Sequence, residues 1–299
     1  MAITVNTNMA ALTAQSALNK STNKMNTAME RMTTGYKINS SKDDAAGLAV
    51  SSNLEYKMSS LKVAQNNAQM GASLLETTEG IMSTISDNLT RVRDLTEQAA
   101  NGTYGSDALG AINTEIKARL DEITRIASSA DFNGKKVLDG SMDKGVVLQV
   151  GIDGSKDSQI TLDAKLFADA KADTLLGKTF TAFTDDNSAR TFLGDVDKAI
   201  KAITERKTEI GGKQAAITSA MESAQVMQTN LTSANSLIKD ADIAEESSNY
   251  IKQQILQQTS ASLLATANQA PSIALNLVLF SAYTTESGKQ PLRANSICL

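Results

Sequence analysis

The residues that could carry out chemistry in this chain of 299 amino acids are few and scattered. Two pairs of adjacent aspartates occur, Asp43-Asp44 and Asp185-Asp186, and paired acids can hold a cation or cleave a glycosidic bond. Adjacent acids point to different faces, and no partner group stands at a suitable spacing. We therefore interpret both pairs as helix caps or solvated loops.

The composition removes further classes of function. The chain has no histidine, the commonest general base and metal ligand, and its single cysteine, Cys298, cannot form an internal disulfide or a zinc cluster. Basic residues number 29 and acidic residues 33, without a basic patch, so we expect no nucleic-acid partner. No apolar run reaches about 18 residues and no Sec signal peptide is present, so we expect no membrane partner. No nucleophile, base and orienting group occur together, so we expect no enzyme, catalytic site, metal or cofactor.

The elements that would position any site are long helices with a seven-residue apolar repeat. Two of these helices lie at the ends of the chain and are rich in Ala, Ser and Thr. We expect them to pair with each other and to become ordered only on assembly, because alone each would be marginal. Their candidate interface positions, which would form the core of a polymer, are Ala11, Leu18, Met25, Met32, Leu256, Leu263, Ala270 and Leu277.

Two further repeats lie inside the chain, and the first of them, at 44–100, would be about 80 Å long as one helix. A shorter apolar face runs from Leu109 to Ala127. A helix with one apolar stripe must bury that stripe. The two inner repeats and this shorter helix should therefore pack together as an antiparallel bundle. The candidate core of that rod is Leu54, Leu61, Leu75, Met82, Leu89, Ile203, Ile210, Ile217, Leu231 and Ile238.

The middle of the chain loses the helical period. Residues 146–150 and 159–162 are predicted to be the two strands of a β-hairpin, and the pattern from 163 to 193 is weak. The predicted fold is mainly α: an elongated antiparallel helical bundle or coiled coil with a small β-hairpin excursion in the middle and paired N- and C-termini. We divide it into a terminal coiled-coil domain (1–43 and 250–277), a helical rod domain (44–140 and 193–249), a hairpin and short variable region (141–192), and a tail (278–299).

The two halves of the chain carry motifs that resemble bacterial flagellin. These are ITVNTN at 3–8, AMERMTTG at 28–35, KDDAAGL at 42–48, TRVRDL at 90–95, FNGKKVL at 132–138 and ADIAEE at 241–246, in the order of that family. The resemblance covers about residues 1–150 and 193–277. The large outer domains of longer flagellins are absent, since 163–192 is too short for them. The tail, 278–299, resembles no axial protein and is either a translated extension or a real adaptation.

The resemblance implies a function that spacing does not show. It implies a secreted structural subunit that polymerises with itself into the extracellular flagellar filament and is exported unfolded through the flagellar secretion channel. The implied partners are an export chaperone at the C-terminal helices and the filament cap and hook-junction proteins. A flagellin-sensing animal Toll-like receptor is a secondary partner, with Arg91, Leu95 and Glu115 as the candidate receptor-binding residues. The alternatives are a hook–filament junction protein or a coiled-coil binding module that does not polymerise.

Overall fold

The computed structural model describes residues 7–286, and they belong to two compact units. The terminal unit comprises residues Met1–Ser52 and Ala234–Leu299, and the central unit comprises Asn53–Ser233. Two long helices, α2 (Ala45–Ala99) and α5 (Asp186–Lys239), contribute to both units. The fold is mainly α, as the periodicity predicted.

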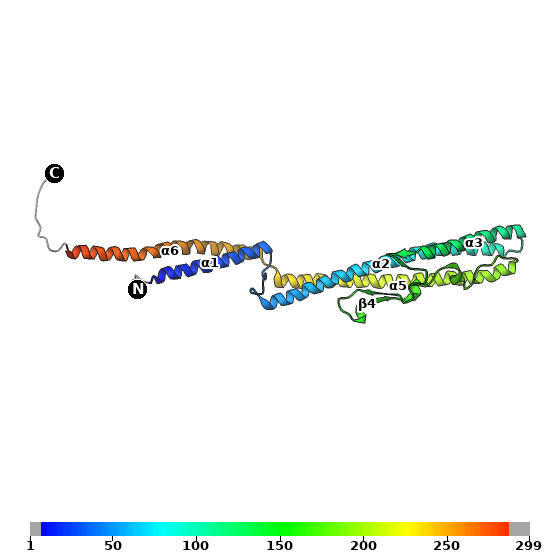
Figure 1. Ribbon diagram of the computed structural model, residues 1–299, viewed down its shortest axis with the longest axis horizontal. Helices are drawn as coiled ribbons and strands as arrows, with labels where there is room; N and C mark the ends of the chain where they lie inside the picture. Colours follow the sequence, from blue (N-terminus) through cyan, green and yellow to red (C-terminus); the bar gives the residue numbers. More distant parts are fainter. Residues whose placement is uncertain (1–6, 287–299) are drawn as a thin grey trace, which may run out of the picture. The chain divides into compact units, whose positions relative to one another are not determined.

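The terminal unit is built on α1 (Met9–Thr34) and α6 (Ile243–Glu286), which run side by side (Figure 1). Helix α1 ends at Gly35, which takes the left-handed conformation with φ 74° that glycine adopts without strain. The chain beyond it pairs with the connection between α5 and α6. Lys37 N–H donates to Lys239 C=O, and Ala241 N–H donates to Gly35 C=O. The segment after α1 and the segment before α6 are thus joined by backbone bonds, in addition to the packing of the two helices.

The acidic pairs act as helix caps, which confirms their interpretation. The Asp44 carboxylate accepts hydrogen bonds from Ala46 N–H at 3.0 Å and Gly47 N–H at 2.9 Å, at the start of α2. The Asp185 carboxylate accepts from Ser188 N–H at 2.7 Å, at the start of α5. These three bonds satisfy amides that the first turn of a helix leaves without partners.

The central unit packs α2 and α5 with α3 (Ser106–Ser129), as the three apolar faces predicted. Its continuous core begins at Ala68 in α2 and extends to Ile217 in α5. Of the candidate rod-core residues, Leu54, Leu231 and Ile238 are half-buried, and Ile238 belongs to the terminal unit. The others are buried, namely Leu61, Leu75, Met82, Leu89, Ile203, Ile210 and Ile217.

Two antiparallel hairpins follow α3. The first joins β1 (Asp131–Phe132) to β2 (Lys135–Lys136). The second joins β3 (Val146–Gln149) to β4 (Gln159–Leu162), with Val146 opposite Leu162, and confirms the predicted hairpin. Its loop contains a short 3-10 helix, η1 (Lys156–Ser158). Leu148 on β3 lies over Gly71 of α2, where a Cβ atom would collide with it, so Gly71 lets the hairpin approach the helix.

Residues 163–185, which we call the strap, are far more ordered than their weak pattern suggested. They contain η2 (Ala164–Phe167) and α4 (Ala172–Leu176), and they bury Leu166, Phe167 and Phe183 in the core of the central unit. The Asn113 side chain of α3 holds the strap by two bonds to Phe183, accepting from its N–H at 2.9 Å and donating to its C=O at 3.1 Å. The strap is therefore part of the core layer of the central unit.

A charge cluster near the strap makes the stability of the central unit depend on pH. The Asp195 carboxylate lies 2.5 Å from Lys178 Nζ and 3.1 Å from Lys198 Nζ. Hydrogen bonds from Lys178 and then Lys198 hold the pKa of Asp195 below its ordinary value. A carboxyl whose pKa is lowered by folding stabilises the native state at neutral pH, and this contribution is lost as the pH falls below the ordinary aspartate value of about 3.9.

We therefore expect Asp195→Asn to lower the melting temperature at pH 7, and the difference from the parent chain to disappear in acid. Thermal unfolding followed by circular dichroism between pH 7 and pH 2 measures this. Asp173→Asn, at an exposed position of α4, is the control and should melt in parallel with the parent chain. A difference for Asp195→Asn that stays constant over the whole pH range would contradict the prediction.

Candidate assembly interface

The α1 side of the terminal pair follows the predicted repeat. Ala11, Leu18, Met25 and Met32 are half-buried, and Ser21 and Ala28, which lie between them on the same face, are buried. Small residues at alternate seam positions allow two helices to approach closely. The apolar stripe of α1 therefore faces α6, and its use as a polymer interface would require a further surface.

On α6, the residues that face α1 are different from those that the repeat indicated. Leu256 and Leu263 are exposed, whereas Ser260 is buried and Gln257, Leu264 and Ala267 are half-buried. Gln257 Nε2 donates to Thr22 Oγ1 at 3.0 Å. Polar and small residues thus fill the seam, and the two leucines point away from α1. The side chains of Ala270 and Leu277 lie outside the described residues.

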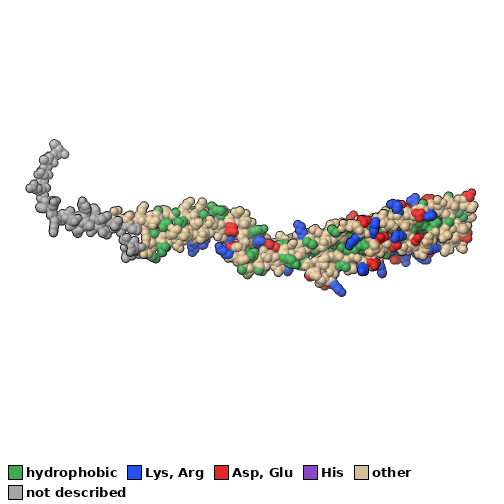
Figure 2. Space-filling view, in the orientation of Figure 1, with side chains coloured by type: hydrophobic (Ala, Val, Ile, Leu, Met, Phe, Trp, Pro, Cys, Tyr) green, Lys and Arg blue, Asp and Glu red, His purple; other side chains and the backbone are tan. Residues whose placement is uncertain are grey.

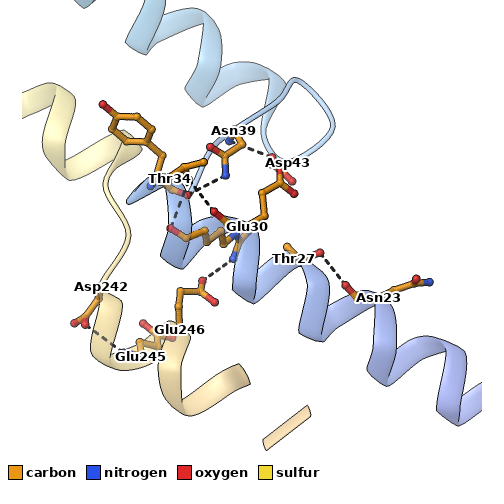
Figure 3. Close-up of polar contacts among 11 residues, drawn as sticks. Asn23, Thr27, Glu30, Thr34, Asn39, Asp43, Asp242, Glu245 and Glu246 are labelled. Carbon is orange, nitrogen blue, oxygen red and sulfur yellow. Dashed lines mark hydrogen bonds and ion pairs between the residues drawn. The ribbon is translucent and has the colours of Figure 1, made fainter. Parts of the chain in front are cut away.

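One ion pair fixes the register of the two terminal helices, and we call it the Arg31–Glu246 clasp. Arg31 Nη1 lies 2.9 Å from Glu246 Oε1, and only 28% of the arginine side chain and 11% of the glutamate side chain are exposed. Figure 3 shows Glu246 on α6 directed toward α1. Arg31 Nε is buried and has no acceptor in the described part of the chain. The Glu246 carboxylate is therefore the acceptor that compensates the guanidinium of Arg31 for its burial.

The outer surface of the terminal pair is poor in charge and carries large apolar side chains among neutral polar ones. From Gln253 to Thr285, α6 contains no charged residue, and neither does α1 from Met9 to Asn19. Exposed apolar patches of this kind are typical of protein interfaces. The large apolar side chains exposed there include Met9, Leu12, Met29, Ile243, Ile251, Ile255, Leu256 and Leu263.

The candidate receptor-binding residues are only partly on the surface. Arg91 on α2 and Glu115 on α3 form an exposed ion pair with a distance of 2.8 Å between Arg91 Nη2 and Glu115 Oε1. Leu95 is only 2% exposed, so its placement in an outward patch was wrong. Leu95 continues the buried stripe of Leu89 and Val92 in α2, and its side chain packs in the apolar core of the central unit.

Among the described residues, no helix is long and apolar enough to cross a membrane, and no group of three or more acidic, Cys or His side chains is placed to hold a metal ion.

Comparisons with known proteins place this architecture in a family. Residues 5–143 match the bacterial flagellin N-terminal helical region, and residues 193–278 match the bacterial flagellin C-terminal helical region. The chain is 31% identical to polar flagellin F of Vibrio parahaemolyticus, over 93% of this chain and all of that protein. It is 32% identical to the flagellar filament 30.7 kDa core protein of Treponema maltophilum, over 88% of this chain and 95% of that one.

A solved structure shares the fold at low identity. The putative flagellar hook-associated protein from Vibrio parahaemolyticus is 17% identical, with a TM-score of 0.53 over 65% of this chain and 98% of that chain. The family match ends at residue 278, while α6 continues to Glu286. The chain belongs to the bacterial flagellins, as a short form without a large outer domain, and is a structural subunit of the extracellular flagellar filament rather than an enzyme.

Proposed function

We propose that copies of this chain associate in the filament through the outer surface of the terminal unit. The observation that carries this proposal is the row of exposed apolar side chains, including Leu256 and Leu263, on a helix pair that has long stretches without charge. Burying such a surface against other copies is favourable by about 25 cal/mol for each Å² of apolar area. In this proposal, α1 and α6 first pair through their polar seam and then pack with other pairs through their outer faces.

The same composition supports export in the unfolded state through the flagellar secretion channel. A seam filled by Ser260, Gln257 and small residues buries little apolar area, so the isolated terminal pair would be marginally stable. We propose that an export chaperone binds the C-terminal helices before assembly and that the filament cap and hook-junction proteins contact the subunit afterwards. The exposed apolar face of α6 supports such contacts because it is open in the monomer.

Two alternatives remain distinct from this proposal. The shared fold with a putative hook-associated protein keeps the hook–filament junction role as an alternative. A coiled-coil binding module would use the same helices without forming a polymer. The identity to flagellins, over nearly the whole length of those proteins, favours the filament role.

The experiment that tests the proposal is seeded polymerisation of the purified chain, imaged by electron microscopy, beside a version truncated after Leu277. Filaments from both chains support the proposal and make the tail a tolerated addition. Filaments from the truncated chain alone support it and make the tail an inhibitor of assembly. If neither polymerises under conditions where another flagellin does, the proposal fails and the two alternatives take its place.

We also propose that a flagellin-sensing Toll-like receptor binds the exposed pair of Arg91 and Glu115. Two oppositely charged side chains from α2 and α3, held together on an open surface, offer a partner both a donor and an acceptor. We expect Arg91→Ala to reduce receptor activation by the monomer about tenfold, because a lost charged hydrogen bond at an interface is worth about 1.4 kcal/mol or more.

A receptor reporter assay with purified monomer measures the effect of Arg91→Ala. Arg125→Ala is the matched control, because it also breaks an exposed arginine–glutamate pair, with Glu122, on the neighbouring helix. The control should activate the receptor as the parent chain does. Equal activation by all three proteins would refute the binding site.

A further inference from the structure

Two asparagines of the central unit are followed by glycine, Asn101 and Asn133, and both stand in turns. In such a pair the backbone nitrogen of the glycine can attack the side-chain amide carbon of the asparagine, since glycine has no Cβ atom to shield that nitrogen. The attack forms a five-membered succinimide ring and releases ammonia, and water then opens the ring to aspartate or isoaspartate. The rate of this reaction depends on how each turn holds the glycine nitrogen.

The Asn133-Gly134 pair is tightly constrained. It forms the two-residue turn between β1 and β2, whose ladder pairs Phe132 with Lys135. Both turn residues take left-handed conformations, with φ of 50° and 78°, as a tight hairpin turn requires. Gly134 N–H donates to the Asp131 carboxylate at 3.2 Å. Attack by the Gly134 nitrogen would therefore have to break this bond and rotate a backbone that the strand ladder holds on both sides.

The Asn101-Gly102 pair, in the turn between α2 and α3, is much less constrained. Both residues are exposed, and Gly102 N–H has no acceptor among the residues that the structure describes. The Asn101 side-chain oxygen accepts from Thr103 N–H at 3.3 Å, which folds the side chain back along the backbone and polarises its carbonyl for attack. Tyr104 N–H donates to Asn101 C=O at 3.4 Å, a long bond that restrains the turn only weakly.

We propose that Asn101 is a site of spontaneous deamidation. The Gly102 nitrogen bonds to Asn101 Cγ, the proton of that nitrogen leaves with the side-chain amide as ammonia, and water adds to the ring. The product has a carboxylate where the chain had a neutral amide, and the isoaspartate form also lengthens the main chain by one carbon. The reaction needs no second protein, so this inference is independent of how copies of the chain associate.

The new carboxylate would arise among existing charges. Figure 2 shows acidic and basic side chains gathered over the part of the central unit that contains α3. A Cβ atom on Gly102 would lie 3.7 Å from Asp186 Oδ2. Arg190 pairs with Asp186 at 2.9 Å, and its Nη2 donates to Ala100 C=O at 3.4 Å. Deamidation therefore adds an anion beside an aspartate and at the C-terminal end of α2, where the helix dipole also opposes it, and makes Arg190 the neighbouring cation for both carboxylates.

The test follows both asparagines in the purified full chain during incubation at mildly alkaline pH, by mass spectrometry of the peptides that contain them. Since the Gly134 nitrogen must first lose a hydrogen bond to a charged group, Asn101 should convert about tenfold faster than Asn133. Aspartate and isoaspartate should both appear at position 101. Conversion of Asn101 no faster than that of Asn133 would overturn the inference.

Two variants test the geometry of the two turns. Gly102 does not take the left-handed conformation, and an added Cβ atom would meet only the ordinary contact with Asp186, so Gly102→Ala should keep the fold while it slows the conversion of Asn101 several-fold. Asp131→Ala frees Gly134 N–H and should speed the conversion of Asn133. Unchanged melting temperatures would show that both variants fold. Equal conversion of Asn101 in the parent and Gly102→Ala chains would contradict the proposed site, whatever the chain does in the polymerisation assay.

Discussion

Replacing Phe167 with Ala is expected to lower the unfolding free energy of the central unit by about 3–5 kcal/mol. Phe167 is fully buried in η2, beside Leu166 and the apolar stripes of α2 and α5. Removing a buried ring loses its transfer free energy and leaves a cavity that rigid helices cannot fill. The effect is therefore expected to be large even though the residue lies in the region that the sequence assigned as short and variable.

Chemical denaturation of the full chain, followed by circular dichroism, measures this loss for the central unit. Phe180→Ala is the matched control, because Phe180 is only half-buried at the edge of an aromatic cluster, with its ring centroid 5.4 Å from that of Phe183. It should cost less, about 1–2 kcal/mol. A loss below about 1 kcal/mol for Phe167→Ala would show that the strap is not part of the folded core.

Replacing Glu246 with Ala is expected to release the terminal helix pair. The variant removes the carboxylate that pairs with the Arg31 guanidinium, which already has one unsatisfied buried donor, and leaves only the more distant charge of Asp43. Breaking such a pair costs about 2–3 kcal/mol here, less than the roughly 3–5 kcal/mol of a fully buried pair, since Arg31 keeps some contact with water. A helix pair with a polar seam has little other stabilisation, so the loss should separate the two helices.

Hydrogen exchange of the α1 amides measures the separation, which should speed exchange in α1 and leave α3 unchanged. Glu245→Ala is the matched control, since the neighbouring glutamate is exposed and contributes about 0.5 kcal/mol or less through the helix dipole. The double variant Arg31→Met/Glu246→Leu should restore protection, because apolar residues of similar size can replace a buried ion pair. If Glu246→Ala exchanges like Glu245→Ala, the clasp does not hold the pair.

The sequence by itself determined the helices, the caps and the second hairpin. Long repeats without proline in the first 270 residues specify α2 and α5, because nothing interrupts their backbone bonds. Short runs rich in Val, Ile and Leu around Leu148 and Ile160 specify two strands. Asp44 and Asp185 specify helix starts because their carboxylates fit the free amides of a first turn. Each of these features depends on interactions between residues that are close in sequence, so the sequence alone predicts it.

Only the tertiary structure decided which face of each helix is covered. In α6 the sequence offers two neighbouring stripes, and the one with Ser260 and Leu264, rather than Leu256 and Leu263, packs against α1. Leu95 is buried because α2 is covered by other helices at that point. The strap has no clear periodicity, and contacts such as those of Asn113 and Phe167 give it its place. A repeat in the sequence specifies that a helix has an apolar stripe. Whether that stripe is buried depends on which other helix or loop packs against it.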